Sequence, residues 1–337
     1  MKKQFFYLLL LLVTLSACND TQASQQKSAT GEKKLIITSF YPLAFMTEQI
    51  VGDKAQVINM AGSVDVHAYE PSPQDLVKLN KAHLVVFQGA ELEPWTDGVI
   101  PGLKEKGIQT LAVSQHLELA KMEDHGDHED EHDKHNESKD EHDEKHHESE
   151  KAHDESKEGH DEHHHGEFDP HTWLDPVLAQ QMVNEVLNVI VVIDPANETL
   201  YKANAQALKK RFATLDQAFQ TGLAQCANEE LIISHDAYGY LAKRYDFEAH
   251  TISGLSSQDE PSAQILAELT KEAAEGISHI LVEENSIRRF ADTLARETGL
   301  KTLPANPLGR GTLDPQKDFI DVMEENLNSF KIALNCQ

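Results

Sequence analysis

Short apolar runs alternate with segments of helical periodicity along most of the chain. Six apolar runs have the length of a buried strand and fall into two groups of three, at residues 35–40, 55–60, 82–88, 231–234, 277–283 and 301–304. Apolar residues at helical spacing fill most of the intervals, at 43–51, 74–80, 176–193, 261–275, 286–298 and 315–334. Strands that alternate with helices favour parallel sheets covered on both faces. The pattern therefore predicts an α/β protein with two Rossmann-like lobes.

A long helix is predicted between the two groups of strands. Asp194 and Pro195 form a typical helix start, because a capping side chain precedes a proline in the first turn. The helical pattern continues to about Gly222, a length of roughly 42 Å at 1.5 Å per residue. A helix of this length suits a rigid connection. We therefore expect a first lobe at 35–193, a linker helix at 194–225 and a second lobe at 226–337.

One segment of the first lobe breaks every pattern. Residues 123–167 contain 12 histidines, 20 acidic residues and 5 lysines, so their net charge is −15. A segment with so few apolar residues cannot bury a core, and we expect a disordered insertion. The segment is either a solvated spacer or a weak, multivalent collector of metal cations.

The N-terminus resembles a targeting segment. Lys2 and Lys3 precede an apolar run that is too short to span a bilayer as a helix, and the run ends in small residues before Cys18. This pattern is typical of a lipoprotein signal peptide at 1–17, after which Cys18 is acylated and anchors the chain to a membrane. An ordinary secretory signal with an incidental cysteine is the alternative. The polar stretch 18–34 is expected to be a flexible tether.

Export and charge limit the function classes further. Cys226 and Cys336 remain after acylation of Cys18, and an even pair in an exported chain predicts one disulfide rather than two free thiols. The formal net charge of −27 repels phosphates, so we do not expect nucleic-acid binding. The same charge attracts cations.

Three histidines outside the insertion lie at the ends of predicted elements. His67 follows the second strand, His171 precedes a helix, and His235 lies at the carboxyl end of a strand. Ligands of open α/β sheets bind beyond the carboxyl ends of the strands, so the three side chains could meet in a cleft between the lobes. Four further histidines are expected to have structural or surface roles: His83, His116, His250 and His279.

The three junction histidines are candidate metal ligands. Neutral imidazole suits zinc, and tetrahedral coordination needs only three or four groups. Asp169, Asp175 and Asp236 are neighbours that could orient the rings.

The segments around these histidines resemble a known family. VHAYEPSP (66–73), DPHTWLDP (169–176) and SHDAYGY (234–240) are similar to signature segments of the metal-binding solute-binding proteins of bacterial ABC transporters, and SSQDEPSAQ (256–264) is similar to a further element. The resemblance is greatest to the zinc-specific branch. It implies two α/β lobes joined by one long rigid helix, with the ion held in the cleft by His67, His171 and His235.

The resemblance also implies a function and leaves one ligand open. Zinc would be captured outside the cytoplasm, in the periplasm or at the outer face of the cytoplasmic membrane, by a monomer that delivers it to a membrane permease. His235 favours zinc, because manganese-type members have a carboxylate at that position. Asn306 replaces an aspartate that some relatives use as a fourth ligand, and Val66 replaces an adjacent glutamate. A water molecule is the expected fourth ligand.

Three other functions are consistent with parts of the sequence. An importer of manganese or iron would share the fold, and a surface adhesin that stores zinc would rely on the insertion. A zinc enzyme would also hold its metal with three histidines and water. We do not expect an enzyme, because no predicted helix of the sequence carries an HExxH motif and there is no clear general base.

Overall fold

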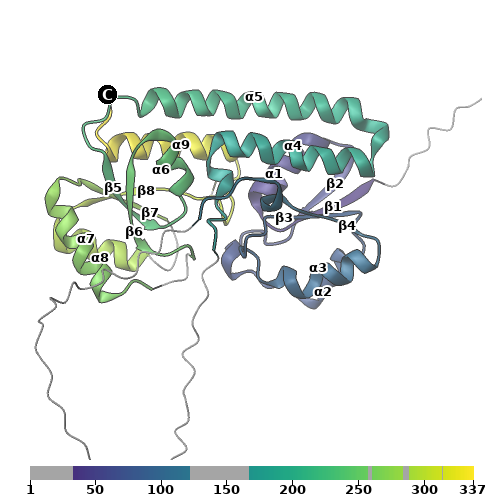
Figure 1. Ribbon diagram of the computed structural model, residues 1–337, viewed down its shortest axis with the longest axis horizontal. Helices are drawn as coiled ribbons and strands as arrows, with labels where there is room; N and C mark the ends of the chain where they lie inside the picture. Colours follow the sequence, from purple (N-terminus) through teal and green to yellow (C-terminus); the bar gives the residue numbers. More distant parts are fainter. Residues whose placement is uncertain (1–32, 122–166, 257–259, 284–287, 313) are drawn as a thin grey trace, which may run out of the picture. The chain divides into compact units, whose positions relative to one another are not determined.

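The computed structural model describes residues 33–121, 167–256, 260–283, 288–312 and 314–337. The expected signal peptide, Cys18, most of the tether and the insertion up to residue 166 lie outside these ranges, as do residues 257–259 of the SSQDEPSAQ segment. The described residues form two α/β lobes connected by a long helix (Figure 1). The predicted fold class is therefore confirmed.

The first lobe is built on a parallel sheet with the strand order β2-β1-β3-β4. Its strands are β1 (Lys34–Thr38), β2 (Ala55–Asn59), β3 (Leu84–Phe87) and β4 (Gln109–Ala112). Helices connect them: α1 (Tyr41–Val51), α2 (Pro73–Leu79) and α3 (Trp95–Glu105). Central β3 is buried along its whole length, as expected for the uninterrupted apolar run LVVF.

The second lobe repeats this topology with the strand order β6-β5-β7-β8. Its strands are β5 (Glu230–His235), β6 (Glu248–Ser253), β7 (His279–Val282) and β8 (Lys301–Pro304). Its helices are α6 (Gly239–Tyr245), α7 (Ala263–Glu272), α8 (Arg288–Thr298) and α9 (Phe319–Ala333). In both sheets the strand order reverses between the two central strands: β1 leads outward to β2 and β3 to β4 in the first sheet, as β5 leads to β6 and β7 to β8 in the second. Their carboxyl ends are the expected position of a ligand.

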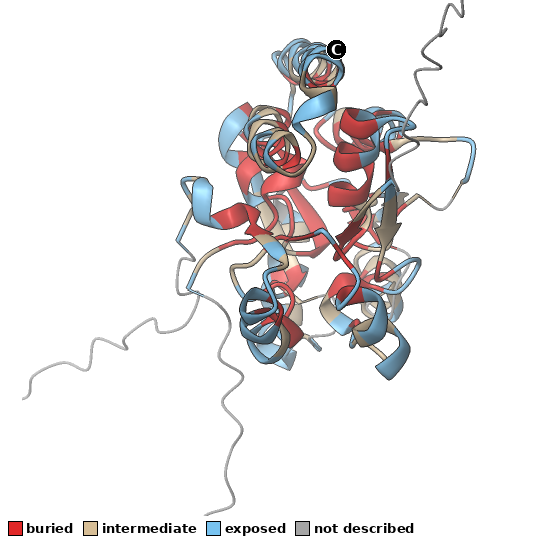
Figure 2. Ribbon diagram, turned by 90° about the vertical axis from the view of Figure 1, so that its right-hand side faces the viewer, coloured by how far each residue is buried: buried red, intermediate tan, exposed pale blue. Residues whose placement is uncertain are grey.

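Two helices hold the lobes together. α4 (Pro176–Ile193) packs against α1 and α5, and α5 (Glu198–Gly222) packs against α1 and α4 in the first lobe and α9 in the second (Figure 1). The buried face of α5 has helical spacing: Tyr201, Ala205, Leu208, Phe212, Leu215 and Phe219. Most of the buried apolar residues form one core cluster with members in both lobes. Figure 2 shows the buried segments inside the molecule and the exposed ones around them.

α4 is long and apolar enough to cross a membrane by composition alone. Its residues Ala179, Met182, Val186 and Ile190 are nevertheless buried in this core. Its apolar character therefore reflects packing between helices.

The structure adds elements that the sequence pattern did not predict. All six predicted strands are present, but β4 and β6 were missed, together with α3 and α6. β4 and β6 are edge strands. β4 buries only Leu111 and Ala112, and β6 has the mixed sequence EAHTIS, so neither gives a clear apolar run.

Two helix starts were predicted three or four residues too early. A 3₁₀ turn, η4 (Pro195–Asn197), precedes α5, so the α-helix begins at Glu198. α9 begins at Phe319, because the Asp318 side chain accepts hydrogen bonds from the backbone N–H groups of Ile320 and Asp321.

The predicted disulfide is present between Cys226 and Cys336, which are 110 residues apart. Closing a loop of this length in the unfolded chain is worth about 4–5 kcal/mol in the chain-entropy model. We expect thiol counting on the non-reduced, unacylated mature chain to find no free thiol. Reduction, or replacement of both cysteines by alanine, should lower the free energy of unfolding by several kcal/mol. A chemical denaturation curve that is unchanged by reduction would contradict this stabilisation.

Candidate metal site

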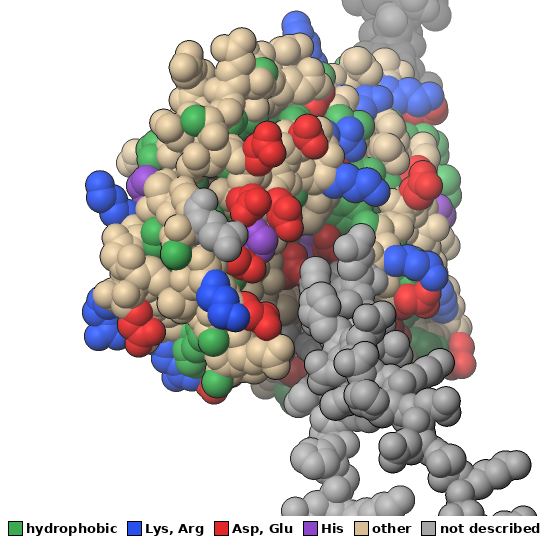
Figure 3. All heavy atoms as spheres, turned by 60° about the vertical axis from the view of Figure 1, so that its left-hand side comes forward, with side chains coloured by type: hydrophobic (Ala, Val, Ile, Leu, Met, Phe, Trp, Pro, Cys, Tyr) green, Lys and Arg blue, Asp and Glu red, His purple; other side chains and the backbone are tan. Residues whose placement is uncertain are grey.

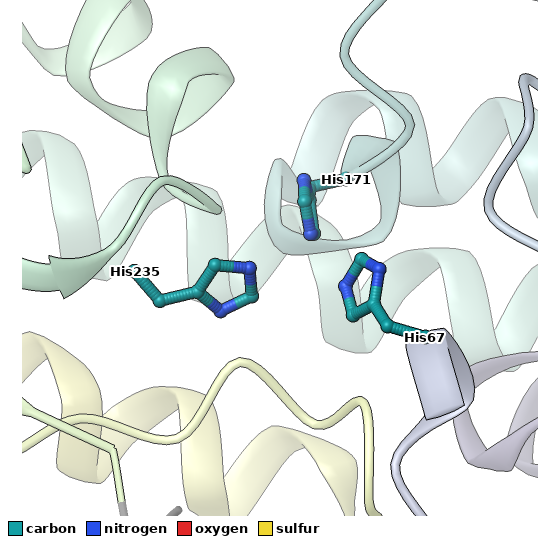
Figure 4. A group of neighbouring side chains, drawn as sticks. All are labelled: His67, His171 and His235. Atoms are coloured by element: carbon teal, nitrogen blue, oxygen red, sulfur yellow. The ribbon is translucent and has the colours of Figure 1, made fainter. Parts of the chain in front are cut away.

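The structure brings together the three histidines that the sequence singled out. His67 lies in a 3₁₀ turn, η1 (Val66–Ala68), that follows β2; His171 immediately precedes η3 (Thr172–Leu174) and α4; His235 is the last residue of β5. Their ring centroids form a nearly equilateral triangle with sides of 5.4, 5.4 and 5.1 Å. One nitrogen from each ring lies within 4.8 Å of the other two. The rings converge on a common point from both lobes (Figure 4).

His171 is held with one nitrogen free. The residue is fully buried, and its Nδ1 lies 2.8 Å from Asp169 Oδ1, which also accepts the His171 backbone N–H at 2.9 Å. Its Nε2 is buried and has no hydrogen-bond partner among the described residues. A proton on Nδ1, donated to Asp169, leaves a lone pair on Nε2. An unpartnered buried nitrogen of this kind is what a metal ligand requires.

His235 is held differently, because both of its nitrogens face acceptors. Nδ1 lies 3.1 Å from Glu283 Oε2, and Nε2 lies 2.8 Å from the backbone oxygen of Leu255. An imidazole can donate from both nitrogens only when it is protonated. Burial lowers the pKa of His235, but the hydrogen bond and charge of Glu283 outweigh burial and raise the pKa above its ordinary value. His235 in this state therefore carries the proton that a metal would displace.

The other two rings are neutral. Burial, followed by the neighbouring histidines, lowers the pKa of His67 well below its ordinary value. Burial and the charge of His235 lower the pKa of His171 in the same way. Burial also raises the pKa of Asp169 to about 7. A cation that enters the site would therefore meet two neutral imidazoles and would have to displace a proton only from His235.

A pocket of about 370 Å³ opens beside His67. Its wall combines Phe168, Pro170, Leu255 and Ser256 with the acidic residues Glu91 and Asp97. Acidic side chains also gather elsewhere on the surface, as on the face shown in Figure 3. Negative charge around an opening raises the local concentration of cations.

The aspartates that were predicted to orient the rings have different roles. Asp169 contacts His171 as expected. Asp175 instead caps α4 by accepting from the backbone N–H groups of Val177 and Leu178, and it pairs with Arg244 at 2.6 Å. Glu283 was not predicted, although it directly follows a strand that pairs with β5. Its position at the carboxyl end of a central strand, where ligands of such sheets bind, is the sequence feature that could have identified Glu283 as part of the site.

Asn306 is fully engaged in a turn. Its Nδ2 donates to Gly311 O at 3.1 Å, and its Oδ1 accepts from Leu308 N at 2.8 Å. Its backbone N–H and C=O both bond to the side chain of Asn326. These bonds hold both side-chain polar atoms of Asn306, in agreement with its expected unsuitability as a ligand.

The four remaining histidines lie outside the triangle. His83 Nδ1 accepts from Leu35 N at 3.1 Å, which fits a structural role. His116 and His279 contact Glu185 and Ser278, respectively. His250 lies among carboxylates at the far end of β5 and β6.

Two α/β lobes with a three-histidine cluster between them are the arrangement expected of a metal-binding protein of the solute-binding class. The chain belongs to the ZnuA family, described as zinc-uptake complex component A, periplasmic, whose model matches residues 36–333. The resemblance inferred from the histidine segments is therefore confirmed.

Named relatives agree with this assignment. The chain is 34% identical over 327 residues to the zinc-binding lipoprotein AdcA of Streptococcus pneumoniae, covering 95% of this chain and 59% of AdcA. It is 32% identical to the high-affinity zinc uptake system protein ZnuA of Bacillus subtilis, covering 98% and 96% of the two chains. The crystal structure of the Zn(II)-bound ZnuA-like domain of S. pneumoniae AdcA matches with a TM-score of 0.68 and 30% identity, covering 90% of this chain and all of that domain.

Proposed function

We propose that this protein captures zinc outside the cytoplasm and delivers it to the permease of an ABC importer. The observation that carries the proposal is the triangle of half-buried His67 and buried His171 and His235, with the lone pair of His171 Nε2 left free. Membership of the zinc-uptake family and the zinc-binding names of the relatives support it. The proposed role consists of binding and release, without chemical conversion of a substrate.

His67, His171 and His235 are the proposed protein ligands, with water in the fourth position. Tetrahedral zinc with Zn–N bonds of about 2.0–2.1 Å separates its nitrogen ligands by roughly 3.3 Å. The three nitrogens already lie within 4.8 Å of one another, so small movements of the rings would bring them to this separation. Asp169 and Glu283 orient His171 and His235 and increase the basicity of these imidazoles.

Zinc binding also connects the lobes. His67 and His171 belong to the first lobe and His235 to the second. When His235 coordinates the metal, one of its ring nitrogens loses its proton and its present hydrogen-bond acceptor. The metal thereby adds a link between two lobes that are already joined by hydrogen bonds. Trp173 Nε1 donates to Pro307 O at 2.7 Å, and the Tyr240 hydroxyl donates to Asp169 O at 2.7 Å.

The remaining parts of the proposal concern the whole chain. A signal peptide at 1–17, a lipid on Cys18 and a tether at 18–34 would place a monomer at the membrane surface. The lipoprotein name of AdcA supports the anchor. Lobes at 35–193 and 226–337 would flank the linker at 194–225. The histidine-rich insertion at 123–167 would collect zinc beside the cleft through many weak contacts.

Metal analysis of the purified mature chain tests the function directly. We expect one tightly bound zinc ion per chain, both with and without residues 123–167. The full chain should bind additional zinc weakly. A chain that holds no tight zinc, or that holds manganese equally well, would reject the proposal.

The pH dependence of zinc binding should follow His235. Its pKa is raised, so the metal-free site holds a proton below that value and zinc must displace it. We expect the affinity to fall by about tenfold per pH unit as the pH drops through the raised pKa. His67 and His171 have lowered pKa values and should add to this slope only at much lower pH. Competition titrations between pH 8 and pH 5 measure the slope.

Glu283→Gln provides the matched control for the pH profile. The amide keeps the shape of the side chain but removes the charge that raises the pKa of His235. The midpoint of the pH profile should then move to lower pH. An unchanged midpoint would show that another group controls the proton.

A further inference from the structure

A second group of metal-ligating side chains lies at the opposite end of the second sheet. Glu230 begins β5 and is the register partner of Glu248, the first residue of β6. His250 follows two residues after Glu248, so its side chain lies on the same face of the strand. Glu230 and His235 are the two ends of one six-residue strand, which separates the two groups by roughly 16 Å.

The three side chains are close enough to share one ion. One nitrogen of His250 and one carboxylate oxygen each of Glu230 and Glu248 lie within 4.8 Å of one another. His250 Nε2 is 3.4 Å from Glu230 Oε2. The same Nε2 is buried and has no hydrogen-bond partner among the described residues. The ring therefore directs Nε2 toward the Glu230 carboxylate, within ion-pair distance but without a hydrogen bond.

The other nitrogen of His250 faces a carboxylate from a different element. Nδ1 lies 3.2 Å from Glu272 Oε2, at the end of α7. In the cleft, Nδ1 of His171 faces Asp169 and Nδ1 of His235 faces Glu283 in the same way. Metal-bound histidines typically direct their second nitrogen to a carboxylate, which fixes the orientation of the ring. His250 thus has the arrangement of a ligand, with Glu272 as its orienting partner.

The charges around His250 leave an excess of carboxylate. Burial raises the pKa of Glu272, and the charges of Glu230, Glu268 and Glu248 raise it further, whereas His250 lowers it. A single imidazole can offer at most one positive charge to several negative ones. A divalent cation would balance the group better.

The site would be accessible. The His250 side chain is 19% exposed, while the side chain of Glu230 is 48% exposed. A cation can therefore reach the carboxylates from solvent and can keep water molecules as additional ligands.

We propose that Glu230, Glu248 and His250 Nε2 bind a divalent transition-metal ion at a second site, distinct from the cleft. The mixed nitrogen and oxygen set suits zinc, and the two carboxylates also accept manganese. Solvent exposure makes the site weaker than the buried cleft. The ion would cross-link β5 to the edge strand β6 and, through Glu272, fix the end of α7.

Anomalous scattering at the zinc edge tests the site in crystals of the full mature chain. We expect one zinc peak in the cleft and a second at about 2.0–2.2 Å from His250 Nε2 and the carboxylate oxygens. His250→Gln should lose the second peak and keep the cleft peak, which also shows that the variant is folded. A wild-type crystal with an occupied cleft and no second peak would overturn the proposal, as would a second peak that persists in His250→Gln.

Thermal unfolding tests the same second site in solution. After one equivalent of zinc has filled the cleft, excess zinc should raise the Tm of the wild-type chain again, because the second ion binds the folded state. His116→Gln, which changes an exposed histidine outside the group, should keep this second rise, and His250→Gln should lose it. Glu272→Gln should weaken the second site about 10–100-fold. Equal second rises in both histidine variants would show that the effect arises elsewhere.

Discussion

Replacing His171 with alanine is expected to weaken tight zinc binding by more than about 100-fold, which exceeds the usual effect of removing an orienting partner. His171 is the proposed ligand with a fully buried ring and a free Nε2, so its loss removes one of three protein ligands. The alanine variant also leaves Asp169 buried without its imidazole partner. Calorimetric titration of the purified mature chain measures the change.

Two matched variants separate the cleft from the other histidines. His116→Ala removes an exposed imidazole and should leave tight binding unchanged. Deletion of residues 123–167 removes 12 histidines but should reduce only the number of weakly bound ions. Any tight binding by the insertion would require ordering a segment that the sequence predicts to be disordered. If the deletion abolishes tight binding and His171→Ala retains it, the proposed roles are reversed.

Manganese is expected to bind the cleft orders of magnitude more weakly than zinc. Three imidazoles form a nitrogen-only protein ligand set, whereas manganese prefers carboxylate and other oxygen ligands. Zinc also lies well above manganese in the general order of affinities for such ligands. Competition between the two ions on the metal-free mature chain measures the ratio. Comparable affinities would contradict the nitrogen-only site.

His235→Asp tests whether the ligand set controls this selectivity. The carboxylate should reduce zinc affinity and narrow the ratio between zinc and manganese. Glu283 lies next to the new carboxylate, so the double variant His235→Asp, Glu283→Gln removes the repulsion between the two acids. A selectivity ratio that neither variant changes would indicate that His235 is not a ligand.

The central strands and the ligand candidates were predictable because their physical signals are local. β3 and β5 are buried apolar runs. His67 follows β2 and His235 is the last residue of β5, so both lie at the carboxyl ends of strands, where ligands bind. β6 was not predictable from hydrophobicity, because an edge strand needs only one buried side and carries polar residues such as Glu248.

The partners of the histidines were harder to predict than the histidines. Asp169 is two residues from His171, whereas Glu283 is 48 residues from His235 and reaches it only through strand pairing. Asp175 resembles Asp169 in sequence context but is used as a helix cap. Sequence context alone does not distinguish these roles, because each depends on which strand or helix lies next to the side chain in space.

The Cys226–Cys336 bond makes the second lobe a covalent ring. It joins the residues just after α5 to the penultimate residue of the chain, so all of β5 to α9 lies between the two sulfur atoms. A protease that cuts once inside this ring opens it but releases no fragment. Cleaved chains would keep their mass on a non-reducing gel and divide into two bands only after reduction. Stability of this lobe toward proteases would therefore be overestimated by any assay that omits a reductant.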